Sequence, residues 1–165
     1  MLPGYTIHIS SIKLLLCRDS AIYDQNHCAG ILCFSDFRQI PEHIPFRHSV
    51  SLVFQDIYDP ADRNAFNSEL AEELTRFIFT LPDGITDLYI ACDAGASRSP
   101  AIAAALLRAS HRSDKTIWKN PRYYPNPLVY KTVCQAFHLH TPKIMIRFRV
   151  RLNHAAFRNA QRNHK

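Results

Sequence analysis

Residues 87–107, which read DLYIACDAGASRSPAIAAALL, decide the fold that this chain is expected to adopt. Asp87–Ala91 is a short apolar run of the kind that forms a buried strand. Ala101–Ser110 is rich in alanine and leucine, which favour a helix. Small residues fill the loop between them, Cys92–Pro100. This stretch therefore predicts a strand, a tight loop and a helix in succession.

The sequence before this stretch repeats the same order. His48–Phe54 is rich in β-branched and aromatic residues and predicts a strand. Apolar residues at three- and four-residue steps then predict a helix that is capped by Asn64 or Asn67 and ends near Thr80. Two more strands and a final amphipathic helix are expected at Tyr5–Ile9, Gly30–Phe34 and Leu128–Phe137. Together these elements predict one α/β domain with a central, mainly parallel sheet flanked by helices.

Composition agrees with a globular protein in a reducing compartment. The chain has 165 residues, of which 47% are hydrophobic, and length alone makes a single domain the default. Its five cysteines include no CxxC pair, and an odd number without a framework favours free thiols. No run approaches the roughly 20 apolar residues that a membrane span needs. We therefore expect a soluble cytoplasmic protein without a membrane span.

Positive charge is concentrated at the C-terminus. Residues 143–165 hold seven of the 20 Lys and Arg residues and none of the 14 Asp and Glu residues. The remaining 13 basic and 14 acidic residues leave residues 1–142 close to neutral. We therefore divide the chain into a domain of residues 1–142 and a basic C-terminal extension, residues 143–165, packed on the domain or trailing from it.

Within this extension, apolar and basic residues alternate. Even-numbered positions from Ile144 to Leu152 are apolar, and three of the odd-numbered positions between them are arginines. This period of two predicts an edge strand whose basic face discourages aggregation. The composition of Ala155–Arg162 leaves a helix as the alternative. A second account of the positive charge is a phosphate-rich partner, either RNA or an anionic lipid surface.

The loop Cys92–Ser99 carries the chemistry. A loop between a strand and a helix N-terminus directs successive backbone N–H groups at one point, where the helix dipole adds positive charge. Gly95 permits a positive φ, and small neighbours let the backbone surround an anion. A thiol at the mouth of this loop, Cys92, is favoured as the nucleophilic thiolate. Arg98 can bind two phosphoryl oxygens at once, and Ser99 can donate a hydrogen bond to the sulfur.

The pattern Cys-x-x-Gly-x-x-Arg-Ser between a strand and a helix resembles the protein tyrosine phosphatase superfamily. The stretch Val50–Leu107 is most similar to its compact dual-specificity-like branch, which includes small bacterial phosphatases. The resemblance implies that Cys92 forms a cysteinyl-phosphate while Arg98 and the loop hold the phosphoryl oxygens. The loop residues expected to bind substrate are Asp93, Ala94, Gly95, Ala96 and Ser97. Phosphorylated proteins or peptides, phosphotyrosine-like ones first, are the implied substrates, and no metal or organic cofactor is implied.

The family also has an aspartic acid about thirty residues upstream of the cysteine, on a loop after a strand, which acts as general acid. Asp56, Asp59 and Asp62 lie 36, 33 and 30 positions before Cys92. Spacing alone favours Asp59, and a proline follows it. We select Asp56 because it comes almost directly after the strand that ends at Phe54, which fixes its position best. Asp59 and Asp62 remain alternatives.

One residue departs from the family pattern. The family has histidine before the cysteine, where this chain has Ala91. Without that histidine the thiolate is less favoured, which implies lower activity or a shifted pH optimum. Ala91 therefore favours one rival, a phosphate-binding module with weakened catalysis. The basic C-terminal extension would suit another, a polynucleotide 5′-phosphatase that uses the same loop. A sulfur-transfer or arsenate-reducing enzyme needs a second thiol, and none adjoins Cys92 in sequence. Candidate walls of the substrate cleft are Tyr123, Tyr124 and Asn126.

Overall fold

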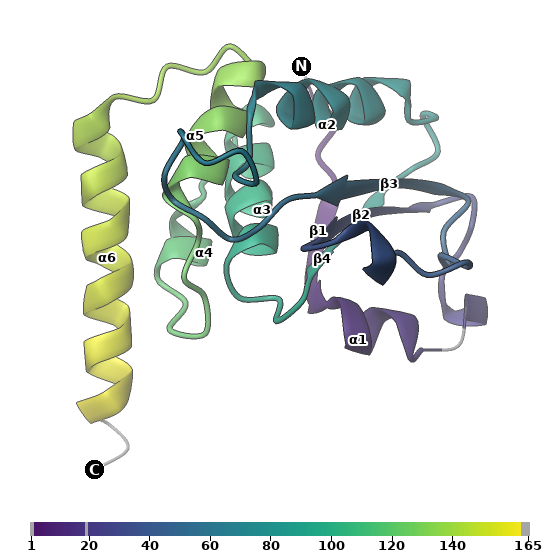
Figure 1. Ribbon diagram of the computed structural model, residues 1–165, viewed down its shortest axis with the longest axis horizontal. Helices are drawn as coiled ribbons and strands as arrows, with labels where there is room; N and C mark the ends of the chain where they lie inside the picture. Colours follow the sequence, from purple (N-terminus) through teal and green to yellow (C-terminus); the bar gives the residue numbers. More distant parts are fainter. Residues whose placement is uncertain (1, 19, 163–165) are drawn as a thin grey trace.

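A parallel sheet in the order β1-β4-β2-β3 lies at the centre of the computed structural model, which describes residues 2–18 and 20–162 (Figure 1). The strands within these residues are β1 (Thr6–Ser11), β2 (Cys28–Phe34), β3 (His48–Val53) and β4 (Asp87–Cys92). Every pairing in the sheet is parallel. The prediction of an α/β fold with a central parallel sheet flanked by helices is therefore confirmed.

The register of the sheet brings three strand ends together. Cys92, the last residue of β4, lies opposite Ser11 of β1 on one side and Cys33 of β2 on the other. Because parallel strands all point the same way, the loops that follow them emerge at this one edge. The β4–α3 loop therefore lies at the carboxyl edge of the sheet, between two neighbouring strands.

Helices cover both faces of the sheet. One face carries α2 (Ser68–Thr80), α3 (Arg98–Ala109) and α5 (Pro127–Ala136), which enclose the larger apolar core with the strands. The short helix α1 (Ile12–Leu16) lies over the other face, where Leu15 packs in a second core. The remaining elements outside α6 are short: η1 (Ser20–Ile22), η2 (Phe37–Gln39) and α4 (Lys115–Trp118).

Two of these helices place the site. The side chain of Asn67 accepts a 3.0 Å hydrogen bond from the Leu70 amide, so Asn67, rather than Asn64, caps α2. In α3, every residue from Ala101 to Ala105 is fully buried. Small side chains let this helix pack closely on the sheet. The loop that precedes α3 is therefore fixed to the best-packed helix of the domain.

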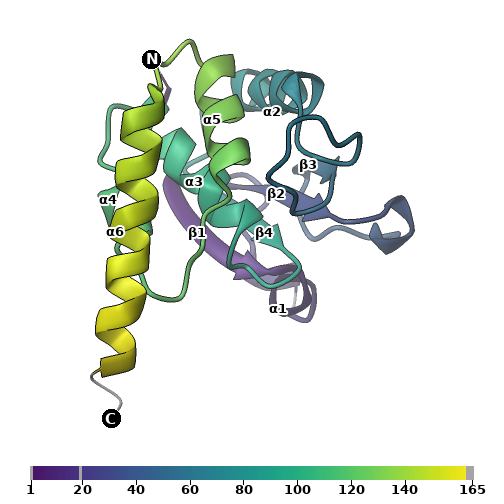
Figure 2. The ribbon, with the colours of Figure 1, turned by 60° about the vertical axis from the view of Figure 1, so that its left-hand side comes forward.

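The basic extension forms a helix, so the predicted strand over residues 144–152 is wrong, and α5 is not the last helix. This helix, α6 (Lys143–Arg162), packs beside α4 and α5 (Figures 1 and 2). Arg149 donates two hydrogen bonds, of 3.0 and 2.5 Å, to the buried carboxylate of Asp114. Asn153 donates to the carbonyl of Tyr123 at 2.7 Å. These partners on one helical face override the alternating pattern, and they attach α6 to the domain.

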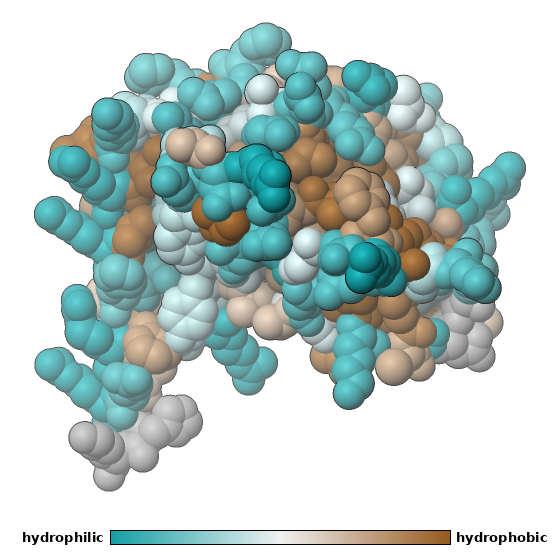
Figure 3. Space-filling view, in the orientation of Figure 1, coloured by the Kyte–Doolittle hydropathy of each residue, from teal (hydrophilic) through white to brown (hydrophobic). Residues whose placement is uncertain are grey.

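Hydrophilic side chains project from the outer side of α6, and apolar surface is exposed near its first turns (Figure 3). Its exposed basic residues recur at three- and four-residue steps, which places them on one helical face. We call this set the basic row: Lys143, Arg147, Arg151, His154, Arg158 and Arg162. None of the helices that the structure describes combines the length and apolar character needed to span a bilayer.

Candidate active site

The loop between β4 and α3 turns against the end of β1. Gly95 has φ +68°, a conformation that L-residues with a side chain rarely adopt. A Cβ atom at this position would lie 2.6 Å from the carbonyl carbon of Ser10 and 2.8 Å from the Ser11 nitrogen. Two features therefore require glycine here: the positive φ of the backbone and the close approach of β1.

Cys92 lies at the base of this loop and is almost completely buried. Its sulfur is 3.1 Å from the hydroxyl oxygen of Ser99, which is buried in the first turn of α3. This distance fits a hydrogen bond between a hydroxyl and a sulfur atom. The predicted pair of Cys92 and Ser99 is thus in contact.

The backbone of the loop presents donors. Within the described residues, the N–H groups of Ala94, Ala96 and Ser97 donate to no protein acceptor, whereas Gly95 N–H donates to the Cys92 carbonyl at 3.2 Å. These N–H groups lead into the N-terminus of α3, a helix of 12 residues. Such an arrangement of donors and helix dipole suits an anion.

Arg98 is buried, with 4% of its surface exposed. Its Nη1 donates to the carbonyl of Phe54, at the end of β3, at 2.8 Å, and its Nη2 donates to Asp93 Oδ2 at 2.5 Å. Asp93 Oδ2 also accepts a 2.8 Å hydrogen bond from the Ser35 hydroxyl. Asp93, expected among the substrate-binding residues, therefore contacts the guanidinium of Arg98 and the end of β2.

Asp56 reaches the loop from the segment after β3. Its Oδ1 accepts hydrogen bonds from the Ser97 hydroxyl at 2.9 Å and from Asn126 Nδ2 at 2.7 Å. Ser97 is the N-cap residue of α3 but makes no side-chain cap, because its hydroxyl donates to Asp56 instead. An N-cap serine usually accepts a hydrogen bond from the first turn of its helix. The Ser97 hydroxyl instead links the loop to the carboxylate of Asp56.

The other two candidate acids contact their own segment. Asp59 accepts a hydrogen bond from the Ala61 amide, and Asp62 accepts one from the Asn64 amide. Both bonds are typical of aspartates that stabilise turns. Of the three aspartates weighed from the sequence, Asp56 is the one whose side chain the structure brings to the Cys92–Ser99 loop.

The segment before α5 packs on the same loop. Tyr124 N–H donates to the Ala96 carbonyl at 2.6 Å, and Asn126 N–H donates to the Ser97 carbonyl at 3.3 Å. Asn126 is fully buried, and its Oδ1 accepts from the first amides of α5, those of Leu128 and Val129. Of the three candidate cleft walls, Tyr124 and Asn126 support the loop through their backbone amides, whereas the Tyr123 amide donates to Asn120 and its carbonyl accepts from Asn153.

Sequence reasoning missed the contacts made by the ends of β2 and β3. Ser35 and the Phe54 carbonyl position Asp93 and Arg98, and Cys33 lies beside Cys92 in the sheet register. Burial raises the pKa of the Cys33 thiol, which keeps it protonated at neutral pH. The sequence signal for them is that they lie at or next to the ends of the predicted strands Gly30–Phe34 and His48–Phe54; which strands are neighbours is not written in the sequence.

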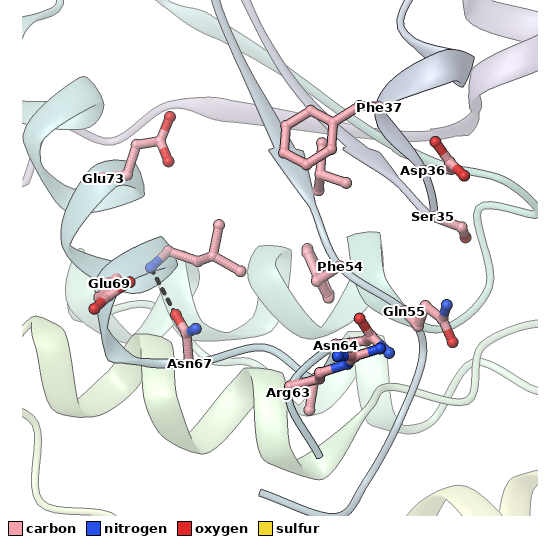
Figure 4. A pocket seen from close by; sticks show the side chains of 13 residues that line it. Ser35, Asp36, Phe37, Phe54, Gln55, Arg63, Asn64, Asn67, Glu69 and Glu73 are labelled. Atoms are coloured by element: carbon pink, nitrogen blue, oxygen red, sulfur yellow. Dashed lines mark hydrogen bonds between the residues drawn. The ribbon is translucent and has the colours of Figure 1, made fainter. Parts of the chain in front are cut away.

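A pocket of about 490 Å³ is lined by residues at the ends of β2 and β3 and by residues of α2, and no residue of Cys92–Ser99 lines it (Figure 4). Ser35, Phe54 and Gln55 lie on one side of the pocket, whereas Glu69 and Glu73 of α2 lie on the other. Arg63 lines the pocket from the segment between β3 and α2. The pocket is connected to the loop through Ser35, which donates to Asp93, and through the Phe54 carbonyl, which accepts from Arg98.

In residues 2–18 and 20–162, no three His, Cys, Asp or Glu side chains gather as ligands of a metal ion would. No protein-family model, no curated protein and no solved structure matches the chain. The function is therefore inferred from the geometry of the loop and of the side chains around it.

Proposed function

We propose that this chain is a cysteine-dependent phosphomonoester hydrolase similar to the compact dual-specificity branch of the protein tyrosine phosphatases. One observation carries the proposal. A thiol and an arginine at the two ends of one loop, Cys92 and Arg98, meet a carboxylate from the segment after β3, Asp56, around backbone N–H donors that suit an anion. The leading substrates are proteins or peptides with phosphotyrosine-like groups.

In the first step, the Cys92 thiolate attacks phosphorus, and the bond between phosphorus and the leaving oxygen breaks. The N–H groups of Ala94, Ala96 and Ser97, together with Arg98, stabilise the charge on the phosphoryl oxygens. Asp56, as the carboxylic acid, donates its proton to the leaving oxygen. The products of this step are the dephosphorylated alcohol and a cysteinyl-phosphate.

In the second step, the Asp56 carboxylate takes a proton from a water molecule, whose oxygen attacks the cysteinyl-phosphate. The bond between sulfur and phosphorus breaks, and inorganic phosphate is released. The Ser99 hydroxyl, 3.1 Å from the sulfur, donates to Cys92 as it leaves as thiolate. Asp56 ends the cycle protonated and ready for the next substrate.

A reducing compartment suits this chemistry, and we place the protein in the cytoplasm. All five cysteines are free thiols in the structure. The nucleophile has to stay reduced to act, because a disulfide or a sulfenic acid at Cys92 cannot attack phosphorus.

The test is hydrolysis of para-nitrophenyl phosphate without added metal. Cys92→Ser is expected to abolish turnover, and Asp56→Asn to lower it by roughly 10²–10⁴-fold. The Asp56→Asn variant is also expected to lose the alkaline limb of the kcat/KM profile, since that limb reports loss of the acid's proton. Absence of turnover by the parent chain at every pH would refute the proposal.

Two matched variants sharpen this test. Asp59→Asn removes a carboxylate three residues from Asp56 and is expected to keep near-parental turnover; a large loss would make Asp59 the acid. Cys33→Ala removes the thiol beside Cys92 and is also expected to keep turnover. Loss of activity in Cys33→Ala would show that turnover depends on the buried side chain that packs beside Cys92.

A polynucleotide 5′-phosphatase is the second candidate, and the basic row on α6 is the observation that favours it. Hydrolysis of triphosphate-ended RNA far faster than of phosphotyrosine peptides would establish it.

The buried Ala91 before the nucleophile is the feature that favours a phosphate-binding module instead. Equal phosphopeptide binding by the parent and by Cys92→Ser, with turnover by neither, would support that module.

A further inference from the structure

The basic row of α6 is long, narrow and directed away from the domain. Its six residues extend from the first to the last residue of a 20-residue helix, which spans about 30 Å. Arg149 and Asn153 lie on the opposite face and bind Asp114 and the carbonyl of Tyr123. The row is therefore free of the contacts that attach α6, and it faces solvent.

No acidic residue of α6 offsets this charge, because residues 143–162 contain no Asp or Glu. The charge of Arg149 is already paired with Asp114 on the packed face. The basic row therefore produces a positive field along the outer face of α6, strongest for ligands that carry several negative charges in a line.

The row is joined to the candidate active site through Tyr124. The ring of Tyr124 lies against the ring of Phe157 on α6, with centroids 5.4 Å apart. The Tyr124 amide donates to the Ala96 carbonyl in the loop, and the Tyr124 side chain is 41% exposed. An exposed aromatic ring between a cationic helix and an anion-binding loop can stack on a base.

We propose that the basic row of α6 binds single-stranded nucleic acid, and that the ring of Tyr124, between α6 and the Cys92–Ser99 loop, stacks on one of its bases. Four of the six residues are arginines, whose guanidinium groups suit the phosphates of a polynucleotide backbone. This binding does not require catalysis at Cys92.

A membrane surface fits this helix less well. A helix that lies in a bilayer interface buries an apolar face in the lipid. The apolar face of α6 is turned toward α4 and α5, and its described large apolar residues that stay exposed are Ile144 and Phe148, both in the first two turns. The arginines extend along the whole of α6, whereas its exposed large apolar side chains are confined to the first two turns, which matches a polynucleotide better than a bilayer.

The test is the fluorescence anisotropy of a short labelled oligouridylate without a terminal phosphate, titrated with the full chain at several salt concentrations. The row variant carries Arg147→Gln, Arg151→Gln and Arg158→Gln. The control variant carries Lys13→Gln, Arg47→Gln and Arg76→Gln, which remove the same charge from exposed positions away from α6. Unchanged near-ultraviolet circular dichroism, which reports the packing of Trp118 and the tyrosines, shows that each variant is folded.

The row variant is expected to bind roughly tenfold more weakly or worse, and the slope of log K against log salt is expected to fall by about 2. The control variant is expected to bind within about twofold of the parent. Equal losses in both variants, or no loss in the row variant, would overturn the proposal. So would binding to phosphatidylserine vesicles that depends on the row when oligouridylate binding does not.

Discussion

The side-chain amide of Asn126 donates a 2.7 Å hydrogen bond to Asp56 Oδ1, although the two residues are 70 positions apart. The same amide donates to the carbonyl of Ile57, and its oxygen accepts from the first amides of α5. Asn126 thus fixes the carboxylate of Asp56 to the start of a helix. The proposed general acid and base, Asp56, has to donate and accept a proton at a fixed place, and the hydrogen bond from Asn126 holds its carboxylate in one orientation.

Asn126→Asp separates the two roles of this residue. The variant keeps an oxygen that caps α5 but replaces the donor to Asp56 with a second carboxylate. We expect kcat for para-nitrophenyl phosphate to fall by about tenfold or more with a smaller change in KM, because Asp56 is no longer oriented. The alkaline limb of the pH profile is expected to move to higher pH, since a neighbouring negative charge favours the protonated acid. A parental profile would show that Asn126 only caps α5.

Asp93→Asn tests the carboxylate beside Arg98. The change removes a negative charge from the anion-binding loop but keeps an oxygen that can accept from the guanidinium. We expect inorganic phosphate to inhibit on the order of fivefold more strongly, because the field at the loop becomes more positive. The measurement is the inhibition constant of phosphate in the para-nitrophenyl phosphate assay. Weaker inhibition would mean that the charge of Asp93 is needed to hold Arg98 in place.

Gly95→Ala tests the close approach of the loop to β1. The new Cβ would meet the backbone of Ser10 and Ser11, and alanine would have to adopt φ +68°. We expect a loss of about 1–3 kcal/mol in the free energy of unfolding and a severe loss of turnover. The matched control is Gly4→Ala, where a Cβ atom meets nothing within 4 Å. Urea unfolding and the phosphatase assay check both variants; similar behaviour of the two would contradict the expectation.

Asp87, the first residue of β4, makes the stability of the domain depend on pH in the acidic range. Its hydrogen bonds with the side chains of His8 and Thr86, both at 2.7 Å, hold the pKa of its carboxyl below the usual value. The stabilisation is therefore complete above the ordinary aspartate pKa of about 3.9 and is lost as the pH falls through the lower, folded-state value.

We expect Asp87→Asn to lower the free energy of unfolding by less than about 1 kcal/mol at pH 6, because the pair is partly exposed. The difference from the parent should shrink toward pH 3. Urea unfolding at the two pH values measures it, with Asp83→Asn, an exposed carboxylate nearby, as the control. A difference that is the same at both pH values would assign the effect to lost packing rather than to ionisation.

Local pattern sufficed for much of the fold and for the centre of the site. The strand ending at Cys92, the small-residue loop and the alanine-rich helix are each visible in a few consecutive residues. The residue order favours Asp56 because it comes almost directly after a strand, and strand ends fix side chains at a sheet edge. The structure places that carboxylate against Ser97.

The remaining features depend on contacts between distant residues. Alternation over residues 144–152 pointed to a strand, but Arg149 binds Asp114, 35 positions away, and that pairing belongs to a helix. Likewise, Cys33 lies beside Cys92 because β2 neighbours β4, a pairing set by the order of strands in the sheet. Such relationships arise when the chain packs, and short-range periodicity does not encode them.

The burial of α3 has a consequence for hydrogen exchange. All residues of this helix except Arg108 are buried, so its central amides can exchange with solvent only when the whole domain opens. The amides of Ala94, Ala96 and Ser97, a few residues earlier, have no acceptor among the residues that the structure describes and are expected to exchange quickly. A sharp step in protection therefore falls between the loop and the helix. An anion bound in the loop would slow the amides before this step, so one exchange experiment reports occupancy of the loop and global stability separately.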